Sequence, residues 1–170
     1  MPRIEPLTHY TPEMQEAAVA HVASGARMTN MKNTLAHDRR AFDALMTWYP
    51  LFDAISEFLG RRRAELLSHA ISVEKDCLVC STYFRRHLIE RGEDPDDLVM
   101  DEEDALMVEF GQQFADDPHR ISDELYARLA NRYDERQVVL LMAFSALMVA
   151  TNYFNDALQV PLDAVLEQYR

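Results

Sequence analysis

The most constraining feature of the sequence is an apolar stretch from Val138 to Ala150, in which Ser145 is the one polar residue. The helix that contains this stretch is predicted to begin at Asp134, which can cap it, and to continue to about Leu158. The apolar stretch is shorter than the ~20 residues that a helix needs to cross a bilayer. Because one helix of a small domain is hard to bury on all sides within its own chain, the pattern predicts burial against another subunit. Central placement within the monomer is the alternative.

The rest of the chain predicts further helices and no sheet. It shows no sustained period-two alternation, it has no Asn-Gly or Asp-Gly pair, and it contains only 4 glycines. We therefore expect a single all-α domain over residues 1–170, of about seven to eight helices, with an N-terminal tail at residues 1–10. The other helices are expected at residues 11–25, in two or three segments between 29 and 60, and at 61–74, 77–91, 101–114 and 122–131.

Charge and leader composition limit the partners and the compartment. The formal net charge of −12 predicts repulsion from nucleic acid and from anionic membrane surfaces. The segment from Met1 to Tyr10 has no apolar core of a secretory signal, so we expect a cytoplasmic protein. In that reducing compartment a permanent disulfide is unusual, which favours redox or metal chemistry for the two cysteines.

The two cysteines form a Cys-x-x-Cys motif, Cys77 and Cys80. Residues three apart share one face of a helix, so these thiols could form or break a local disulfide. We expect Asp76 to cap the helix and Cys77 to be its first residue. The helix N-terminus would then lower the pKa of the Cys77 thiol, whereas the Asp76 carboxylate would raise it. The sequence alone leaves the stronger effect open.

Three other interpretations of the pair compete with redox chemistry. Two cysteines on one face can be simple packing. A structural zinc site needs four ligands, and His69 and His87 are the candidates to complete it, but His87 lies ~10 Å from Cys80 along the same helix. We therefore expect no metal. A thioredoxin-like site would need a βαβ unit that this helical pattern lacks.

Glu65 is a second candidate site residue, because it lies in the helix that precedes the cysteines and consecutive helices usually pack antiparallel. A carboxylate beside a thiol can act as a general base if burial raises its pKa. The alternative is an exposed Glu65 that forms surface ion pairs with Arg61–Arg63. His69, four residues after Glu65, could form a proton relay with it or be a structural histidine.

The stretch RRRAELLSHAISVEKDCLVCSTYFRRHLIERGEDPDDL carries a family resemblance. It contains an Arg-x-Glu-Leu sequence at Arg63–Leu66, a twelve-residue step from Glu65 to Cys77, the Cys-x-x-Cys motif, and a following helix that ends in glycine. In these features, and over most of the chain from Asn33 to Leu166, the sequence resembles the alkylhydroperoxidase-D-like branch of the carboxymuconolactone decarboxylase family.

The resemblance implies an all-α oligomer, a trimer or a hexamer, that acts as a peroxiredoxin-type antioxidant oxidoreductase on alkyl hydroperoxides. It implies Cys80 as the attacking thiol, Cys77 as the resolving thiol and Glu65 in the proton relay, with no cofactor. The implied reductant is a dithiol, such as a lipoyl-bearing adaptor protein. Where this branch usually carries a relay histidine, the sequence has Phe84, so His69 is the candidate substitute.

Three alternative functions stay open at this point. One is the lactone decarboxylase chemistry for which the family is named, whose branch generally lacks the cysteine pair. Another is thiol–disulfide exchange or a stress-related binding role. The last is a non-catalytic helical oligomer with inert cysteines, which Phe84 favours, because phenylalanine cannot transfer a proton.

Overall fold

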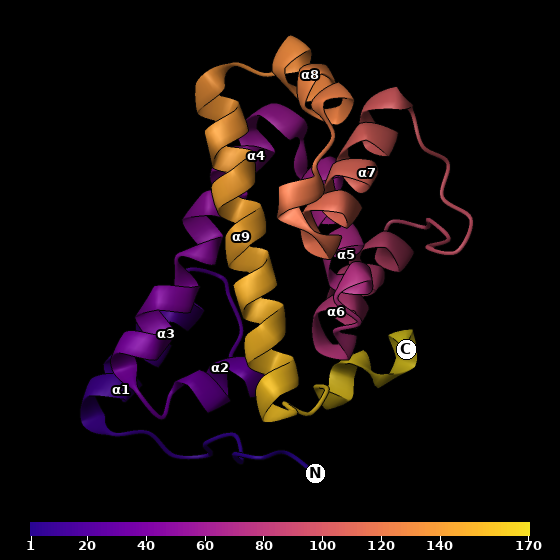
Figure 1. Ribbon diagram of the computed structural model, residues 1–170. Helices are drawn as coiled ribbons and strands as arrows, with labels where there is room; N and C mark the ends of the chain where they lie inside the picture. The colour runs from indigo at the N-terminus through magenta and orange to yellow at the C-terminus, as the bar shows by residue number, and fades with distance from the viewer.

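The computed structural model describes residues 1–170 and is all-helical, with nine α-helices and no strand (Figure 1). The α-helices are α1 (Pro12–Ala23), α2 (Asn30–Leu35), α3 (Arg39–Met46), α4 (Trp48–Leu59), α5 (Arg61–Glu74), α6 (Leu78–Glu90), α7 (Glu102–Asp116), α8 (Asp123–Arg132) and α9 (Glu135–Leu158). Two short 3₁₀ helices, η1 (Pro118–Arg120) and η2 (Ala164–Tyr169), complete the chain. The all-α prediction is confirmed.

The helix count exceeds the expected seven to eight because the segment between residues 29 and 60 divides into three helices. Asp38 caps α3 by accepting the backbone N–H groups of Arg40 and Ala41. Pro50 does not end a helix, because it lies in the first turn of α4, where no intrahelical N–H is needed.

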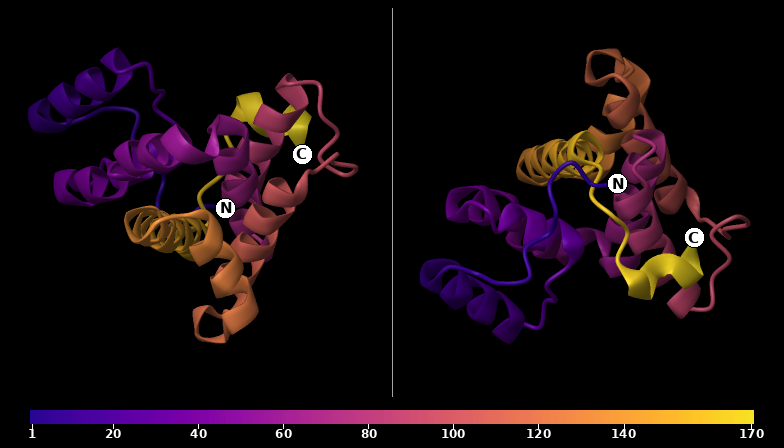
Figure 2. Two further views of the ribbon diagram at one scale, coloured as in Figure 1. Left: turned by 90° about the horizontal axis from the view of Figure 1, so that it is seen from above. Right: turned by 90° about the horizontal axis from the view of Figure 1, so that it is seen from below.

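The helices surround two hydrophobic cores of unequal size. Helices α4 to α9 enclose a core of 18 buried residues, and α9 runs along the front of this bundle in Figure 1. Helices α1 to α3 lie to one side of the bundle, as Figure 2 shows, and share a smaller core of six buried residues. This core consists of Met14, Ala17, Ala18, Leu35, Ala36 and Phe42. The boundary between the two cores is where the cavity described below lies.

The N-terminal tail crosses from one core to the other. The backbone N–H of Arg3 donates to the Leu158 carbonyl at 2.9 Å, at the end of α9. The backbone N–H of Leu7 donates to the Asn33 carbonyl of α2 at 3.1 Å. The tail therefore ties α2 to the end of α9.

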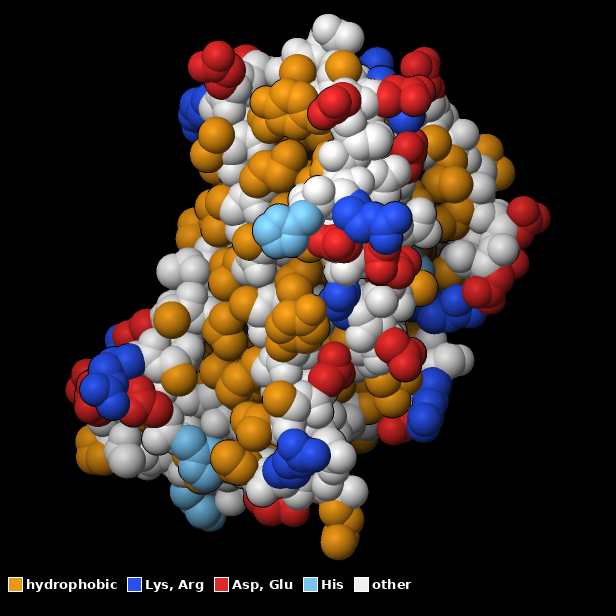
Figure 3. Space-filling model, in the orientation of Figure 1, with side chains coloured by type: hydrophobic (Ala, Val, Ile, Leu, Met, Phe, Trp, Pro, Cys, Tyr) orange, Lys and Arg blue, Asp and Glu red, His pale blue; other side chains and the backbone are white.

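Helix α9 has the predicted bounds but is buried on one side only. Asp134 caps it in a capping box with Gln137. One face packs into the core, whereas Val139 is 65% exposed and Tyr153 is 55% exposed on the other. Apolar side chains run down this face in the space-filling view (Figure 3). By length and composition α9 could span a membrane, although the core helix of a folded protein meets the same criterion.

Candidate thiol site

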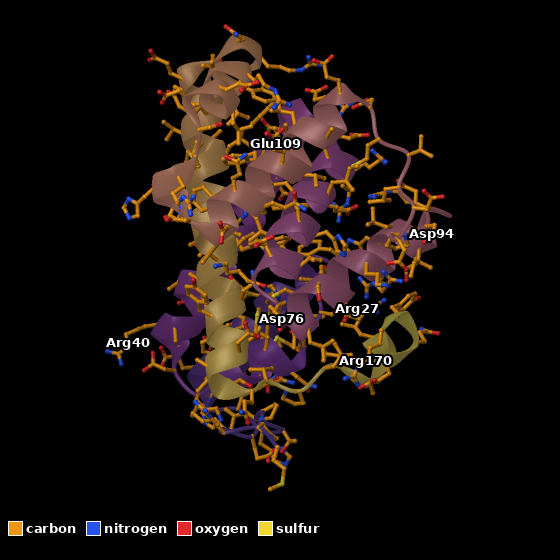
Figure 4. All side chains as sticks on the ribbon, turned by 45° about the vertical axis from the view of Figure 1, so that its right-hand side comes forward. Arg27, Arg40, Asp76, Asp94, Glu109 and Arg170 are labelled. Carbon is orange, nitrogen blue, oxygen red and sulfur yellow. The ribbon has the colours of Figure 1, made fainter.

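The turn between α5 and α6 sets the position of the cysteine pair. Asp76 adopts a left-handed conformation with φ of 53°, and Cys77 is extended, so α6 begins at Leu78. The backbone N–H of Cys77 donates to the Ser72 carbonyl at 3.0 Å, which holds the turn against α5. The prediction that Asp76 caps the helix is therefore wrong by one residue, because Cys77 is the N-cap. In Figure 4, Asp76 is labelled beside the lower end of α9.

The structure brings the two cysteines together as free thiols. Cys77 and Cys80 lie 3.8 Å apart and form no disulfide. Cys77 is 0% exposed and lines neither of the two main pockets, whereas Cys80 is 7% exposed and contributes to the wall of a cavity. Of the two thiols, Cys80 is therefore the one that a small molecule can reach.

Two neighbouring side chains from the end of α9 interact with the thiols. Asn155 donates from Nδ2 to the Cys80 Sγ at 3.2 Å. Burial raises the pKa of Asp156, and the interaction with the Cys77 thiol opposes that rise. Asn155 and Asp156 were not predicted as site residues, although two consecutive polar residues near the end of an apolar helix are a signal that could have identified them.

The hydrogen bond with Cys77, together with burial, raises the pKa of the Cys80 thiol well above its ordinary range. The hydrogen bond from Asn155 acts in the opposite direction and does not outweigh them. The resting Cys80 is therefore a thiol at neutral pH, and any reaction that needs its thiolate also needs a base.

Cys80 opens into a cavity between the two cores. The cavity has a volume of about 80 Å³, it is partly open to solvent, and most of its lining is apolar. Helices α2, α3, α4, α6 and α9 and the C-terminal segment all contribute to it. Its polar lining residues are Thr29, Lys32, Tyr49, Tyr83, Thr151, Asn155 and Asp163. Such a cavity suits a small, mainly apolar molecule.

Glu65 is buried, and its pKa is not shifted in the direction that a general base requires. It is 1% exposed and forms ion pairs with Arg61 at 3.0 Å, with His87 at 3.1 Å, and with Arg91. Burial tends to raise its pKa, but the contacts with His87 and Arg91 outweigh burial and hold that pKa below its usual value. Glu65 is thus an ionised carboxylate within a cationic cluster.

Of the two histidines near the site, the one that contacts Glu65 is not the one that was expected. His69 has no hydrogen bond with Glu65; burial, and then the charge of Arg85, lower its pKa to about 4. The distance of His87 from Cys80 along the helix argued against a place in the site. His87 is nevertheless the histidine that contacts Glu65. The ring of Tyr83, which lines the cavity, lies 4.7 Å from the His87 ring. Tyr83 therefore packs, at the cavity wall, against the histidine that contacts Glu65.

Phe84 occupies the position of the missing relay histidine. It is buried and belongs to the main core, and its ring centre lies 6.2 Å from that of Trp48. It also lines the cavity beside Cys80. Its role at this position is apolar packing around the thiol. The structure brings together no group of three or more His, Cys, Asp or Glu side chains that could hold a metal ion.

Comparison with known proteins supports the fold and leaves the family open. No family model matches the sequence, and no curated protein matches it. The structure is similar to the crystal structure of an uncharacterized peroxidase-related protein from Silicibacter sp. TM1040, with a TM-score of 0.78. The similarity covers 99% of this chain and 93% of that chain at 14% sequence identity. The class that fold and site define is an all-α protein with the fold of a peroxidase-related protein and a buried pair of thiols.

Proposed function

We propose that the protein is a thiol-dependent hydroperoxide reductase of the alkylhydroperoxidase-D-like kind. The observation that carries the proposal is the placement of Cys80 in the wall of an apolar cavity with a second free thiol 3.8 Å away. A structural neighbour described as peroxidase-related is consistent with it. An apolar cavity of this kind fits an organic hydroperoxide better than it fits hydrogen peroxide alone.

In the first step, the Cys80 thiolate attacks the outer oxygen of the hydroperoxide. A sulfur–oxygen bond forms, the O–O bond breaks, and the departing alkoxide takes up a proton to leave as an alcohol. In the second step, the Cys77 sulfur attacks the Cys80 sulfenic acid, so that a disulfide forms and water leaves. Formation of this bond requires the two sulfurs to approach from 3.8 Å to about 2.05 Å.

The surrounding groups supply proton transfer in this proposal. Asp156, which interacts with the Cys77 thiol, accepts the Cys77 proton as the disulfide forms. Cys80 loses its proton to His87, whose ring Glu65 holds in place and which lies beside the Tyr83 ring at the cavity, while Glu65 itself stays ionised. His69 has no part in this path, because its charged neighbours are Arg85 and Asp96.

The cycle closes when an external dithiol reduces the disulfide. The dithiol gives up two hydrogens and becomes a disulfide itself, and both protein thiols are restored. A lipoyl-bearing adaptor protein in a reducing cytoplasm is the reductant that we propose. No resident metal or cofactor takes part in these steps.

The test is consumption of cumene hydroperoxide in the presence of dihydrolipoamide. We expect the wild type to turn over, the Cys80→Ser variant to be inactive, and the Cys77→Ser variant to lose multiple turnover while it still reacts once. Ser81→Ala is the matched control, since the Ser81 hydroxyl bonds only its own helix. Equal rates in all four proteins would overturn the proposal and favour the alternative with inert cysteines.

A further inference from the structure

The cavity contains a buried lysine that the steps above do not use. Lys32 of α2 is 4% exposed and lines the cavity together with Cys80. Its Nζ donates to the Arg27 carbonyl at 2.5 Å and to the Tyr49 hydroxyl at 2.6 Å. Both partners are neutral oxygens. A buried ammonium without a counter-ion is costly, so its presence calls for an explanation.

The hydrogen bonds of Lys32 leave it incompletely satisfied. An ammonium has three N–H donors, and the protein uses two of them. No carboxylate lies within 4.0 Å of Nζ, since Lys32 appears in no ion pair of the structure. Asp163 lines the same cavity, but its Oδ1 accepts the Asn30 backbone N–H at 2.8 Å instead.

The charge on Lys32 persists at neutral pH. Burial lowers the pKa of Lys32 to about 8, and Asp163 opposes that change. The nearby His21 is neutral under these conditions, because burial and the charge of Lys32 lower its pKa to about 4. The cavity therefore combines an apolar body, one cationic wall group and, on a different helix, the Cys80 thiol.

We propose that the cavity binds a small carboxylic acid with an apolar body, whose carboxylate pairs with Lys32 while the rest of the molecule extends along the apolar lining toward Cys80. This inference deepens the proposed function, on which it rests for the reaction but not for the binding: the substrates would be hydroperoxides that also carry a carboxylate. The ligand carboxylate accepts the third N–H of Lys32 and supplies its missing counter-ion. A charge-assisted hydrogen bond is stronger than a neutral one, and it discriminates acids from neutral molecules.

Binding can be measured without any reaction, because the single tryptophan, Trp48, lines the same cavity. The probes are octanoate and 1-octanol, which have the same chain length and differ in charge. We expect quenching or enhancement of Trp48 fluorescence to give a dissociation constant about tenfold lower for octanoate than for 1-octanol. Equal affinities in the wild type, or no binding of either probe, would overturn the inference.

Variants of the two lysines in the chain provide the matched comparison. Lys32→Met is expected to remove the preference for octanoate and to leave 1-octanol binding unchanged. Lys75→Met is expected to keep the preference, since Lys75 lies outside the cavity, beside Tyr153. Persistence of the preference in Lys32→Met would contradict the inference. Lys32→Gln is the second variant if the methionine variant unfolds.

The two proposals can fail separately. Cumene hydroperoxide has no carboxylate, so its reduction by the wild-type protein tests the thiol chemistry without the proposed contact to Lys32. Octanoate has no O–O bond, so its binding tests the lysine and is independent of Cys80. Octanoate binding without cumene hydroperoxide reduction would support the carboxylate site and contradict the proposed hydroperoxide reductase activity.

Discussion

Asn155 is the residue through which α9 acts on the reactive thiol. Its side-chain N–H groups favour the Cys80 thiolate, and they oppose the stronger effects of Cys77 and burial. The pKa of Cys80 therefore depends on one donor whose loss should be directly visible.

Replacement of this donor, Asn155→Leu, is expected to raise the pKa of Cys80 further, by about one to two units, because the thiolate loses a hydrogen bond to a charged group. The measurement is the rate of iodoacetamide alkylation against pH in a Cys77→Ser background, where Cys80 is the single thiol. The midpoint should move to higher pH and the rate at pH 8 should fall. Asn152→Leu is the control, since Asn152 bonds the Met148 carbonyl. An unchanged midpoint would show that the bond to Asn155 has no effect on the thiol.

Glu65 contributes to stability through its three cationic partners. Glu65→Gln removes the charge that pairs with Arg61, His87 and Arg91, and should lower the free energy of unfolding by about 2 kcal/mol at pH 7. Because the pKa of Glu65 is held below its usual value, this stabilisation is present above pH 4.5 and is lost as pH falls through the lowered pKa. Urea unfolding at pH 7 and pH 3 measures the difference, which should shrink at pH 3.

The control is Glu74→Gln on the same helix, where the carboxylate is exposed and forms no ion pair. If the two variants had the same free energy of unfolding at pH 7, the assignment of Glu65 to a stabilising cluster would be contradicted.

At the residue scale the sequence identifies the chemistry but not its surroundings. Cys77, Cys80 and Glu65 are identifiable because their spacing lies within one stretch of chain. Asn155 contacts Cys80 and Lys32 lines the same cavity, each from a distant helix, and no local pattern encodes either placement. A general-base role for Glu65 requires that its pKa be raised. The contacts with His87 and Arg91, which lower that pKa, could not be predicted from the sequence.

At the scale of elements, the close packing of α5 against α7 depends on a glycine. A Cβ at Gly111 would lie 3.1 Å from the Leu67 Cδ1 and from the Leu67 carbonyl oxygen, and 3.2 Å from the Ala70 Cβ. Since α5 carries Glu65 and leads into the cysteine turn, a shift of α7 would be transmitted toward the site.

Gly111→Ala is expected to lower the free energy of unfolding by about 1–2 kcal/mol, because overpacking costs more than the better helix propensity of alanine returns. Chemical denaturation measures the change. Gln112→Ala, at the exposed neighbouring position of the same helix, should be close to neutral. A Gly111→Ala protein more stable than the wild type would show that the helices can separate at no cost.

The first residue of a helix was predictable where a capping residue marks it, and less predictable elsewhere. Thr11 and Asp134 cap the helices that the sequence assigned to them. The start of α6 was misplaced because aspartate is by type a good N-cap and cysteine is not, whereas the left-handed conformation of Asp76 depends on how α5 ends.

At the scale of the whole molecule, the exposed face of α9 predicts self-association. Val139, Ala146 and Tyr153 are exposed and recur every seven residues, so they form one stripe along the helix. An apolar stripe of this length is unusual on the surface of a monomer. The all-α class followed from periodicity alone, whereas the division into two cores, and the cavity between them, depends on how α1 to α3 fold back.

We expect the wild type to sediment as an oligomer at micromolar concentration and Ala146→Glu to shift it toward monomer, because the substitution places a charge at the centre of the stripe. Sedimentation velocity is the measurement, and Ala127→Glu, at an exposed position of α8, is the control. A wild-type protein that is monomeric throughout would contradict the expectation.

The most direct test of the central claim is a single turnover of the reduced protein with one equivalent of cumene hydroperoxide, followed by alkylation and mass spectrometry. We expect one equivalent of the alcohol and a Cys77–Cys80 disulfide, seen as the loss of two hydrogens and of both alkylation sites. Unconsumed hydroperoxide, with both cysteines still alkylated, would contradict the claim that this pair of thiols is a redox site.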